Sequence, residues 1–322
     1  MIDRIALLRH LELSDKPWQL VKHIDDVPVN KIVYPMWGEI KYDGVFCAVV
    51  LGEFQHDAVS RTGKLFYTAV NELLYPYIPK HSSGHVVIGE LINKHCSLEV
   101  LSGLVNPNRV NPWTDEEREL MNGVDYIVHD VLTFGEVIAG FSPIMYRDRS
   151  DRLMRLSANV CIAEGKMLHS QAEFDMYAQE IIAAGGEGIV GKNLHAGYEA
   201  GHKGWRVVKK VRDLHVDLKC LDVQTGKGKR TGQIAKLQFM YKGKLFWADL
   251  GEGWTDEKRA QLTERWVDCV TCPEAPYCNT CLRDNPIGKV FHVKALQESS
   301  KGVLRLPKVM EMRIDKTEED RT

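Results

Sequence analysis

The stretch that decides the fold is Glu39–Phe46, which reads EIKYDGVF. A single lysine, Lys41, stands two residues before an Asp43-Gly44 pair in an otherwise apolar run. Trp37–Ile40 and Val45–Leu51 have the composition of strands, and an Asp-Gly pair is typical of a tight connection between strands. We therefore expect a strand that looks buried to end on an unpaired amine, and such an amine needs a chemical explanation.

Length and composition indicate a soluble protein of two domains. The 322 residues exceed one core of ordinary size. Hydrophobic residues make up 44% and charged residues 27%, and no apolar run approaches the roughly 20 residues of a membrane span. The first residues, MIDRIALLRHLELSD, alternate charge with apolar side chains too often for a signal peptide. We expect a cytoplasmic protein.

The charge balance excludes a globally basic nucleic-acid binder. Lys and Arg number 42 against 44 Asp and Glu, a net charge of -2. Any polyanion must therefore meet local patches. Two are present: Lys203–Arg212 (KGWRVVKKVR), which contains no acidic residue, and the run TGKGKRTG at 225–232. Each fits either a solvated loop or a polyanion contact.

Four of the eight cysteines are clustered near the C-terminus. They form C-x2-C-x5-C-x2-C, two pairs with the spacing that grips one tetrahedral Zn²⁺. Two disulfides or free thiols are the alternatives, and the absence of a secretory signal argues against disulfides. Four thiolates leave no open coordination position, so we expect a structural zinc. The cluster comprises Cys269, Cys272, Cys278 and Cys281.

The order of predicted elements indicates an α+β fold. Near Asp213 the predicted elements change from mixed strands and helices to successive hairpins. We expect domains at 1–212 and 213–322, the second a small barrel of about five strands and one helix (Asp256–Val267) with a Cys-rich insertion at about 268–284. Before the boundary we expect strands at His85–Ile92, Tyr126–Leu132, Gly188–Gly191 and Trp205–Val211, and helices at Asp115–Met121, Asp148–Ser157 and Gln171–Ala184.

Polar residues recur at the ends of these apolar strands, where converging charges build nucleotide sites. After Lys41 they are Arg61 in SRTGK, Glu90 in VVIGELI, Glu187 in GGEGIVGK, Lys209 and Lys210 in WRVVKK, and Arg313, Asp315 and Lys316 in MRIDK. In this order the stretches resemble the covalent nucleotidyltransferases, which comprise ATP-dependent DNA ligases, RNA ligases and mRNA capping enzymes. The likeness is greatest to small, phage-type ATP-dependent DNA ligases.

The resemblance implies a fold and a reaction. The fold is a nucleotidyltransferase domain with ATP-grasp-like antiparallel sheets and helices, followed by an OB barrel. In the reaction, Lys41 attacks the α-phosphorus of ATP and becomes a lysyl-AMP. An ordinary lysine amine is protonated at neutral pH and has no lone pair to offer. We therefore expect burial, a divalent metal and the cation of Lys209 to favour the neutral amine.

The resemblance also assigns roles to the other residues. Glu90 contacts the ribose hydroxyl, Glu187 is a ligand for Mg²⁺ or Mn²⁺ with Glu90 beside it, and His129 in IVHDVL stacks on adenine. The Arg313-Ile314-Asp315-Lys316 segment orients the pyrophosphate leaving group in the first step, which implies domain closure and reopening. The implied nucleotide contacts are Glu39, Ile40, Lys41, Arg61, Glu90, His129 and Lys209, and the implied catalytic residues are Lys41, Lys209, Arg313, Asp315 and Lys316.

The sequence departs from the family pattern at two positions. Phe46 replaces the arginine of the usual KxDGxR, and Val207 stands where a lysine is usual near Trp205. Each change removes a cation from a phosphate site, and loss of one such donor can cost about 100-fold to 1,000-fold in rate. RNA-ligase relatives also lack the first arginine, and we expect Arg206 to reach the phosphate that Val207 does not contact.

We expect the protein to seal 5'-phosphate and 3'-hydroxyl ends at nicks in duplex DNA, in replication or repair. Rival hypotheses are an RNA ligase or capping enzyme, and a catalytically silent nick-binding module. Only about 38 residues precede Glu39, so we expect a monomer that encircles DNA with two domains alone. The predicted backbone contacts are Lys203, Arg206, Lys210, Arg212, Lys227, Lys229 and Arg230.

Overall fold

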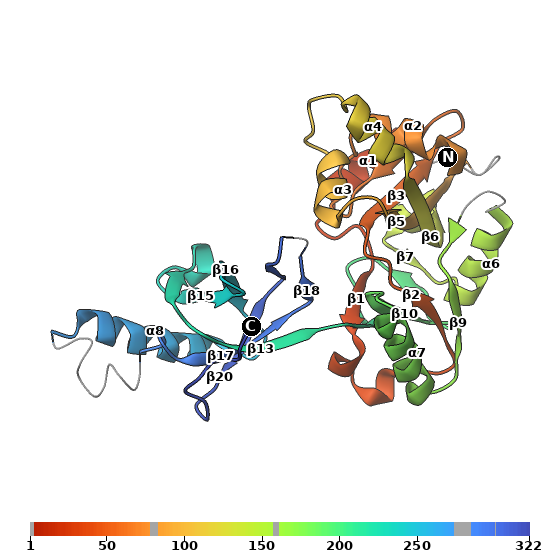
Figure 1. Cartoon of the computed structure of the whole chain (residues 1–322). Coiled ribbons are helices and arrows are strands. Elements are labelled where there is room, and N and C mark those ends of the chain that lie inside the picture. Colours follow the sequence, from red (N-terminus) through yellow and green to blue (C-terminus); the bar gives the residue numbers. More distant parts are fainter. Residues whose placement is uncertain (1–2, 78–82, 157–160, 274–284, 300) are drawn as a thin grey trace. The chain divides into compact units, whose positions relative to one another are not determined.

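The structure is a computed structural model that describes residues 3–77, 83–156, 161–273, 285–299 and 301–322 (Figure 1). The chain divides into two compact units, Met1–Val211 and Arg212–Thr322. None of the helices in the described ranges has both the length and the apolar character needed to cross a bilayer.

The first unit contains two five-stranded sheets. Most neighbouring strands are antiparallel, and the exceptions are β1 with β12 and β6 with β8. The first sheet has the order β1 (Leu20–His23), β12 (Lys203–Val211), β10 (Gly188–Asn193), β2 (Met36–Ile40) and β9 (Gly165–Leu168). The second has the order β4 (His56–Val59), β3 (Val45–Leu51), β5 (His85–Asn93), β6 (Val124–Thr133) and β8 (Cys161–Ile162).

The EIKYDGVF stretch connects these two sheets. Its first residues end β2 in the first sheet, and its last residues begin β3 in the second sheet. Lys41–Gly44 cross from one sheet to the other, and the Lys41 N–H donates to the carbonyl oxygen of Gly188 at 2.9 Å. The turn that the sequence predicts here is therefore a link between sheets, and it places Lys41 at their junction.

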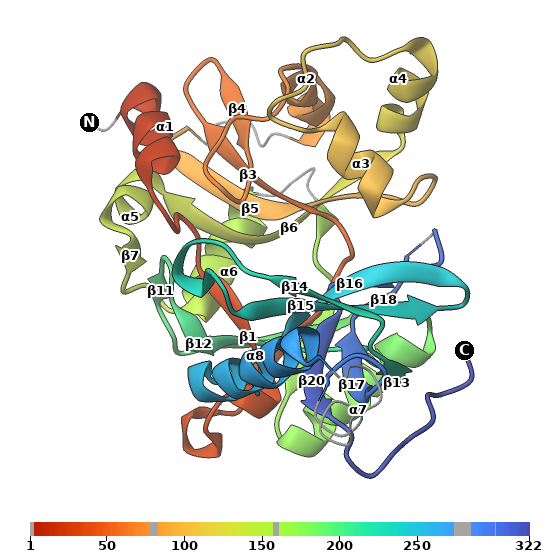
Figure 2. The ribbon, with the colours of Figure 1, turned by 90° about the vertical axis from the view of Figure 1, so that its left-hand side faces the viewer.

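The second sheet is buried on both faces, which explains the unbroken apolar run of β3. Val49 faces one cluster and Val50 the other, as alternation along a strand requires. Figure 2 shows helices on both sides of this sheet. One group is α2 (Ala69–Leu74), α3 (Leu98–Leu104) and α4 (Asp115–Asn122), and the other is α1 (Arg4–Leu13) and α5 (Phe134–Ala139).

The first sheet is covered by α7 (Gln171–Ala183). Ser170 caps this helix by accepting from the N–H of Glu173 at 3.2 Å. Gly185, at φ 89°, ends it as predicted, because a left-handed residue after a helix favours glycine. Phe174 of α7 is fully buried against Met36 and Val208 of the sheet.

Three further elements of this unit support the site. The helix α6 (Tyr146–Leu156) packs beside β6, and the short strands β7 (Phe141–Ser142) and β11 (Tyr198–Glu199) pair with each other.

The second unit is built on a six-stranded sheet. Lys242 and Gly243, at φ 45° and 74°, form a hairpin turn, since both central residues of a type I′ turn need positive φ. The strand order is β13 (Leu214–Lys219), β17 (Val290–Ala295), β20 (Lys308–Met312), β16 (Lys244–Leu250), β15 (Ile234–Tyr241) and β14 (Asp222–Thr225). The remaining elements are α8 (Asp256–Thr271), β18 (Gln297–Glu298) and β19 (Leu304–Arg305).

The predicted strands and helices, including the short α4, agree with the structure to within a few residues, whereas α1, α2, α3 and α5 are not predicted from the sequence. The helix α1 lies in the N-terminal segment whose charges argue against a signal peptide. Asp3 caps it by accepting from the N–H of Ala6 at 2.7 Å, and Leu7 and Leu11, four residues apart, are fully buried. The spacing of these two leucines was the available signal.

Truncation of the α7 core contact tests the packing of the first sheet. We expect Phe174→Ala to lower the free energy of unfolding by about 3–5 kcal/mol, because it removes a fully buried ring. Chemical denaturation measures this. On the same helix, Met176 is 63% exposed, so Met176→Ala should change stability by no more than about 0.5 kcal/mol. Equal effects of the two substitutions would contradict the packing described.

Candidate active site

Lys41 is paired, which corrects the expectation of an unpaired amine. Its Nζ donates to Oε2 of Glu187 at 2.7 Å. The Glu187 side chain is only 5% exposed and that of Lys41 24%. Glu187 directly precedes β10, whereas Lys41 directly follows β2, and these two strands are neighbours in the first sheet. A strand pair thus holds the amine and the carboxylate together.

Gly188 allows this arrangement because no other residue fits beside β12. Its φ is 142°, and a Cβ atom there would lie 2.1 Å from the carbonyl oxygen of Lys210. The close approach draws the start of β10 against the end of β12, which carries Lys209. Burial lowers the pKa of Lys209, and the cation of Lys41 lowers it further. The structure therefore brings Lys41, Glu187 and Lys209 into one electrostatic group.

Glu90 belongs to the same group, although it lies on the second sheet. Burial raises its pKa to about 7, and the cations of Lys41 and Arg61 oppose that rise without cancelling it. Its Oε2 is buried and has no hydrogen-bond partner among the described residues. A buried carboxylate oxygen without a donor is a vacant acceptor position, which a metal ion or a ligand hydroxyl can satisfy.

Phe46 lies opposite Glu90 in the pairing of β3 with β5. Its ring packs 5.5 Å from the ring of Trp18, measured between centroids, and the Arg61 guanidinium carbon lies 5.8 Å from the Phe46 centroid. Trp18 in turn donates to the carbonyl oxygen of Ser60 at 3.2 Å. At the position where the family has an arginine, this chain has Phe46. The guanidinium of Arg61 lies over the Phe46 ring in a cation–π contact.

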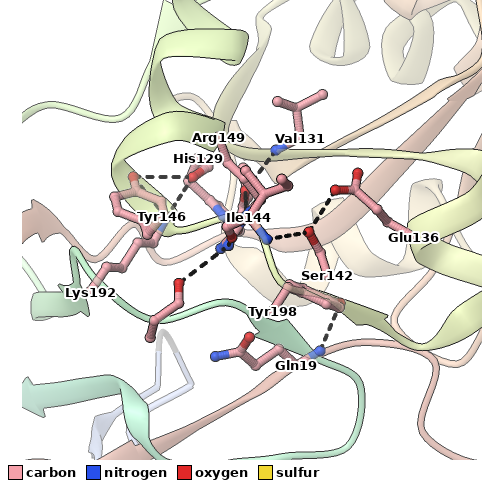
Figure 3. Close-up of polar contacts among 12 residues, drawn as sticks. Gln19, His129, Val131, Glu136, Ser142, Ile144, Tyr146, Arg149, Lys192 and Tyr198 are labelled. Carbon is pink, nitrogen blue, oxygen red and sulfur yellow. Dashed lines mark hydrogen bonds and ion pairs between the residues drawn. The ribbon is translucent and has the colours of Figure 1, made fainter.

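A second polar group surrounds His129 on β6 (Figure 3). Lys192 Nζ donates to the His129 carbonyl oxygen at 2.5 Å and pairs with Glu39 Oε2 at 2.8 Å. Tyr146 Oη donates to Glu39 Oε1 at 2.6 Å. Burial raises the pKa of Glu39, whereas Lys192 opposes that rise. These contacts tie both sheets and α6 together at the backbone of His129.

The His129 ring is neutral at physiological pH. Burial lowers its pKa to about 3, and the cation of Lys192 adds to this effect. Its Nδ1 is buried without a hydrogen-bond partner among the residues described. Next to it, Asp130 forms a bidentate pair with Arg149 at 2.9 Å for both contacts. A neutral ring with a fixed backbone is suited to stacking and to hydrogen bonding with a ligand.

Sequence reasoning missed three residues of this group: Tyr146, Arg149 and Lys192. Lys192 stands inside the quoted GGEGIVGK stretch and is 4% exposed. A lysine that falls within an apolar strand needs a buried acidic partner, and that was the available signal. Tyr146 and Arg149 come from a helix whose face cannot be assigned without the fold.

The predicted nucleic-acid contacts divide into two sets. Arg206 donates to Glu199 and Lys210 donates to Asp175, both at 2.6 Å, so these cations do have acidic partners from elsewhere in the chain. Arg206 contacts Glu199 in this structure, and its predicted contact with a phosphate near Val207 stays a prediction. Arg230 pairs with Asp256. The exposed side chains are Lys203, Lys227 and Lys229, and Arg212 is half-buried.

The remaining predicted residues lie in the second unit. Arg313, Asp315 and Lys316 follow β20 and contact one another through acidic partners. Cys269 is buried in α8, and Cys272 caps its end. Cys278 and Cys281 lie outside the described residues. Within the described ranges, no group of three or more His, Cys, Asp or Glu side chains is arranged to hold a metal ion.

The raised pKa of Glu90 predicts a pH dependence of stability. An acid whose pKa is higher in the folded state holds its proton more tightly there, so folding loses stability as pH rises from about 4.5 through about 7. We expect wild type to lose about 1 to 3 kcal/mol relative to Glu90→Gln across this window. Chemical denaturation at several pH values measures the difference. A constant difference between the two proteins would contradict the assignment.

Comparison with known proteins places this geometry in a family. The profile described as ATP dependent DNA ligase domain matches residues 19–210, and the profile described as DNA ligase OB-like domain matches residues 225–313. A DNA ligase of Pyrobaculum neutrophilum is 32% identical over 262 residues, which is 71% of this chain and 43% of that protein. A probable DNA ligase of Mycolicibacterium vanbaalenii is 38% identical over 99 residues, 27% of this chain and 17% of that protein.

The chain thus spans less than half the length of these relatives. A solved structure of a Lig E DNA ligase, described as binding DNA with a minimal scaffold, superposes with a TM-score of 0.64 at 16% identity and covers 92% of this chain and 98% of that one. The fold is accordingly a nucleotidyltransferase domain followed by an OB-fold domain. With profile matches across most of its length, the chain belongs to the family of ATP-dependent DNA ligases.

Proposed function

We propose that this protein is an ATP-dependent DNA ligase that seals nicks in duplex DNA, with Lys41 as its nucleophile. The observation that supports this most is the Lys41–Glu187 pair at the junction of the two sheets, next to two groups with shifted pKa values, Glu90 and Lys209. Shifted titratable groups that converge on one lysine are typical of a site for nucleophilic catalysis. The alternative hypotheses predict other substrates. A capping enzyme would use another nucleotide, and an RNA ligase would join RNA strands.

In the proposed first step, the Lys41 amine forms a bond to the α-phosphorus of ATP, and the bond from that phosphorus to the bridging oxygen breaks to release pyrophosphate. The amine loses one proton as this bond forms, and Oε2 of Glu187, which accepts the hydrogen bond that orients the amine, is placed to receive it. Lys209 and Arg61 supply fixed positive charge for the phosphate oxygens, which stabilises the transition state more than the ground state. AMP then passes to the 5'-phosphate of the nick, and the 3'-hydroxyl displaces it.

The residues present fit a divalent cation of the Mg²⁺ type. Mg²⁺ is usually held by one or two carboxylates together with phosphate oxygens and water. Glu187 offers a buried carboxylate, and Glu90 offers a buried carboxylate oxygen without a donor among the described residues. These residues would hold the ion, which would supply charge stabilisation for the phosphate oxygens when bound.

The nucleotide base is proposed to lie at the group around His129. The neutral His129 ring offers a stacking surface. Glu39 and Ile40 are the last two residues of β2. Glu39 keeps a fixed orientation because Lys192 and Tyr146 both contact it. The buried Lys192–Glu39 pair acts here as a positioning device for the base site.

DNA contacts are proposed for the basic residues outside this site, at the exposed Lys203, Lys227 and Lys229 together with Arg206, Lys210, Arg212 and Arg230. The acidic partners of Arg206, Lys210 and Arg230 must be exchanged for phosphates if these three take part. We further propose a monomeric cytoplasmic enzyme of replication or repair, similar to phage-type ligases, with domains at 1–212 and 213–322.

Labelling with nucleotide tests the proposed function. We expect incubation with radiolabelled ATP and Mg²⁺ to leave label on the wild-type chain after denaturing electrophoresis, and Lys41→Ala to carry none, since it lacks the nucleophile. The control is Lys166→Ala, which removes a 52% exposed side chain paired with Glu180 and should keep the label. Transfer from labelled protein to nicked DNA completes the test.

The outcomes separate the alternatives. Label from GTP instead of ATP would indicate a capping-type enzyme, and sealing of RNA ends instead of nicked DNA would indicate an RNA ligase. A wild-type chain that binds nicked DNA but takes no label would be the silent nick-binding module that Phe46 and Val207 suggest.

A structural zinc is proposed for Cys269, Cys272, Cys278 and Cys281, on the strength of their spacing. We expect metal analysis of the purified protein to find about one zinc per chain. Cys272→Ser should lose the metal because three thiolates bind it more weakly, whereas Cys161→Ser, which removes an exposed cysteine outside the cluster, should retain it. Zinc retained by Cys272→Ser would count against the assignment.

A further inference from the structure

The RIDK cluster, which we define as Asp217, His292, Arg313, Asp315 and Lys316, lies within the second unit. Asp217 of β13 is 3% exposed and is its centre. Arg313 Nη1 donates to Asp217 Oδ2 at 2.7 Å, Lys316 Nζ donates to the same oxygen, and His292 Nδ1 contacts Asp217 Oδ1 at 2.7 Å. Three basic groups therefore converge on one buried carboxylate.

Asp217 is also fixed by its backbone. Its N–H donates to Asp320 Oδ2 at 2.8 Å, and the N–H of Asp320 donates to the Asp217 carbonyl oxygen at 2.8 Å. These two hydrogen bonds attach the C-terminal segment that follows Arg313 and Lys316 to β13 at Asp217. Burial acts to raise the pKa of Asp217, but its bonds to Lys316 and His292 outweigh burial and lower it. The carboxylate is ionised at neutral pH.

A chain of histidines extends the contact of Asp217 on the other side. His292 Nε2 lies 2.8 Å from His215 Nδ1, and His215 Nε2 lies 3.2 Å from Asp213 Oδ2. A carboxylate only accepts hydrogen bonds, so both outer contacts require an N–H, and the contact between the rings requires a third. His292 is therefore fixed between Asp217 on one side and His215 on the other.

The two carboxylates that hold Arg313 differ in exposure. Asp315 accepts from Arg313 Nε at 2.9 Å and from Nη2 at 2.7 Å, a bidentate pair of the kind that guanidinium also forms with phosphate. Its side chain is 60% exposed, whereas that of Asp217 is 4% exposed. An exposed ion pair is weak and exchanges readily, while a buried and multiply bonded one does not.

We propose that Asp217 is a positioning residue, which holds Arg313 and Lys316 in place for the pyrophosphate leaving group, and that Asp315 is the exchangeable partner that this diphosphate replaces on Arg313. The inference rests on the proposed function. In this arrangement Arg313 keeps its Nη1 bond to Asp217 and turns its Nε and Nη2 edge to the ligand. The Asp217 carboxylate thereby fixes the orientation of the Arg313 guanidinium. A guanidinium that is ordered before the ligand arrives loses less entropy on binding.

The test separates the step that involves pyrophosphate from the step that does not. Three rates are measured on one preparation of each protein: lysyl-AMP formation from ATP, its reversal by added pyrophosphate, and sealing of a synthetic nick that already carries a 5'-adenylate. We expect Asp217→Asn to slow the first two rates about 10- to 100-fold, as loss of a charge-assisted contact to a positioned cation should. Sealing of the adenylated nick should change by no more than about twofold.

Two further variants complete the design. Asp249→Asn removes a strand carboxylate of the same unit that pairs with Lys308 at 3.0 Å and makes no contact with the RIDK cluster, so all three rates should stay near wild type. If Asp217→Asn does not fold, His292→Phe, which removes one donor to Asp217, should show a smaller loss confined to the same two rates.

The outcomes are distinct from failure of the proposed function. Unchanged pyrophosphate-dependent rates in Asp217→Asn, or an equal loss in all three rates, would overturn the positioning role while leaving ligase activity intact. A faster first step would show that Asp217 withholds the cations, which is the opposite of the proposal. A wild-type chain that takes no label and seals no nick would overturn the proposed function and this inference with it.

Discussion

The ion pair between Lys41 and Glu187 is the contact on which the rest of the site depends. It lies where β2 ends and β10 begins, so the hydrogen bonding of two neighbouring strands sets its geometry. The helix α7 packs against both strands through buried residues such as Phe174. Because the amine and the carboxylate come from positions 146 residues apart, only a correctly registered sheet brings them together. A slip of one residue would turn one of them to the opposite face.

The junction between sheets explains the electrostatics of the site. Glu90 comes from the second sheet, whereas Glu187 and Lys209 come from the first. Burial at the junction disfavours charge on any single group. This effect raises the pKa of Glu90 and lowers the pKa of Lys209. Charges of both signs in a dehydrated place are costly until a ligand pairs with them. The proposed triphosphate and divalent cation would bring partners for both kinds of charge.

Much of this could be predicted from the sequence, and the limits have physical causes. The strands around Lys41, Glu90 and Lys209 were predicted because apolar runs bounded by turn residues are a local signal. The partner of Lys41 was missed, since pairing between Glu187 and Lys41 depends on strand order. The partner of Arg206 was missed for the same reason, because Glu199 lies on β11, outside the sheet to which β12 belongs. Phe46 could be recognised as a departure, but its contact with Arg61 could not.

Two ion-pair groups among the described residues illustrate opposite uses of a buried carboxylate. Glu39 is held by Lys192 and Tyr146, and all three are nearly inaccessible to solvent, so this group can only orient its surroundings. Asp217 is equally buried, but its partners Arg313 and Lys316 are partly exposed. A buried anion that contacts partly exposed cations lowers the cost of ordering them. For this reason a carboxylate can assist the binding of another anion, provided that the carboxylate is the deeper of the two.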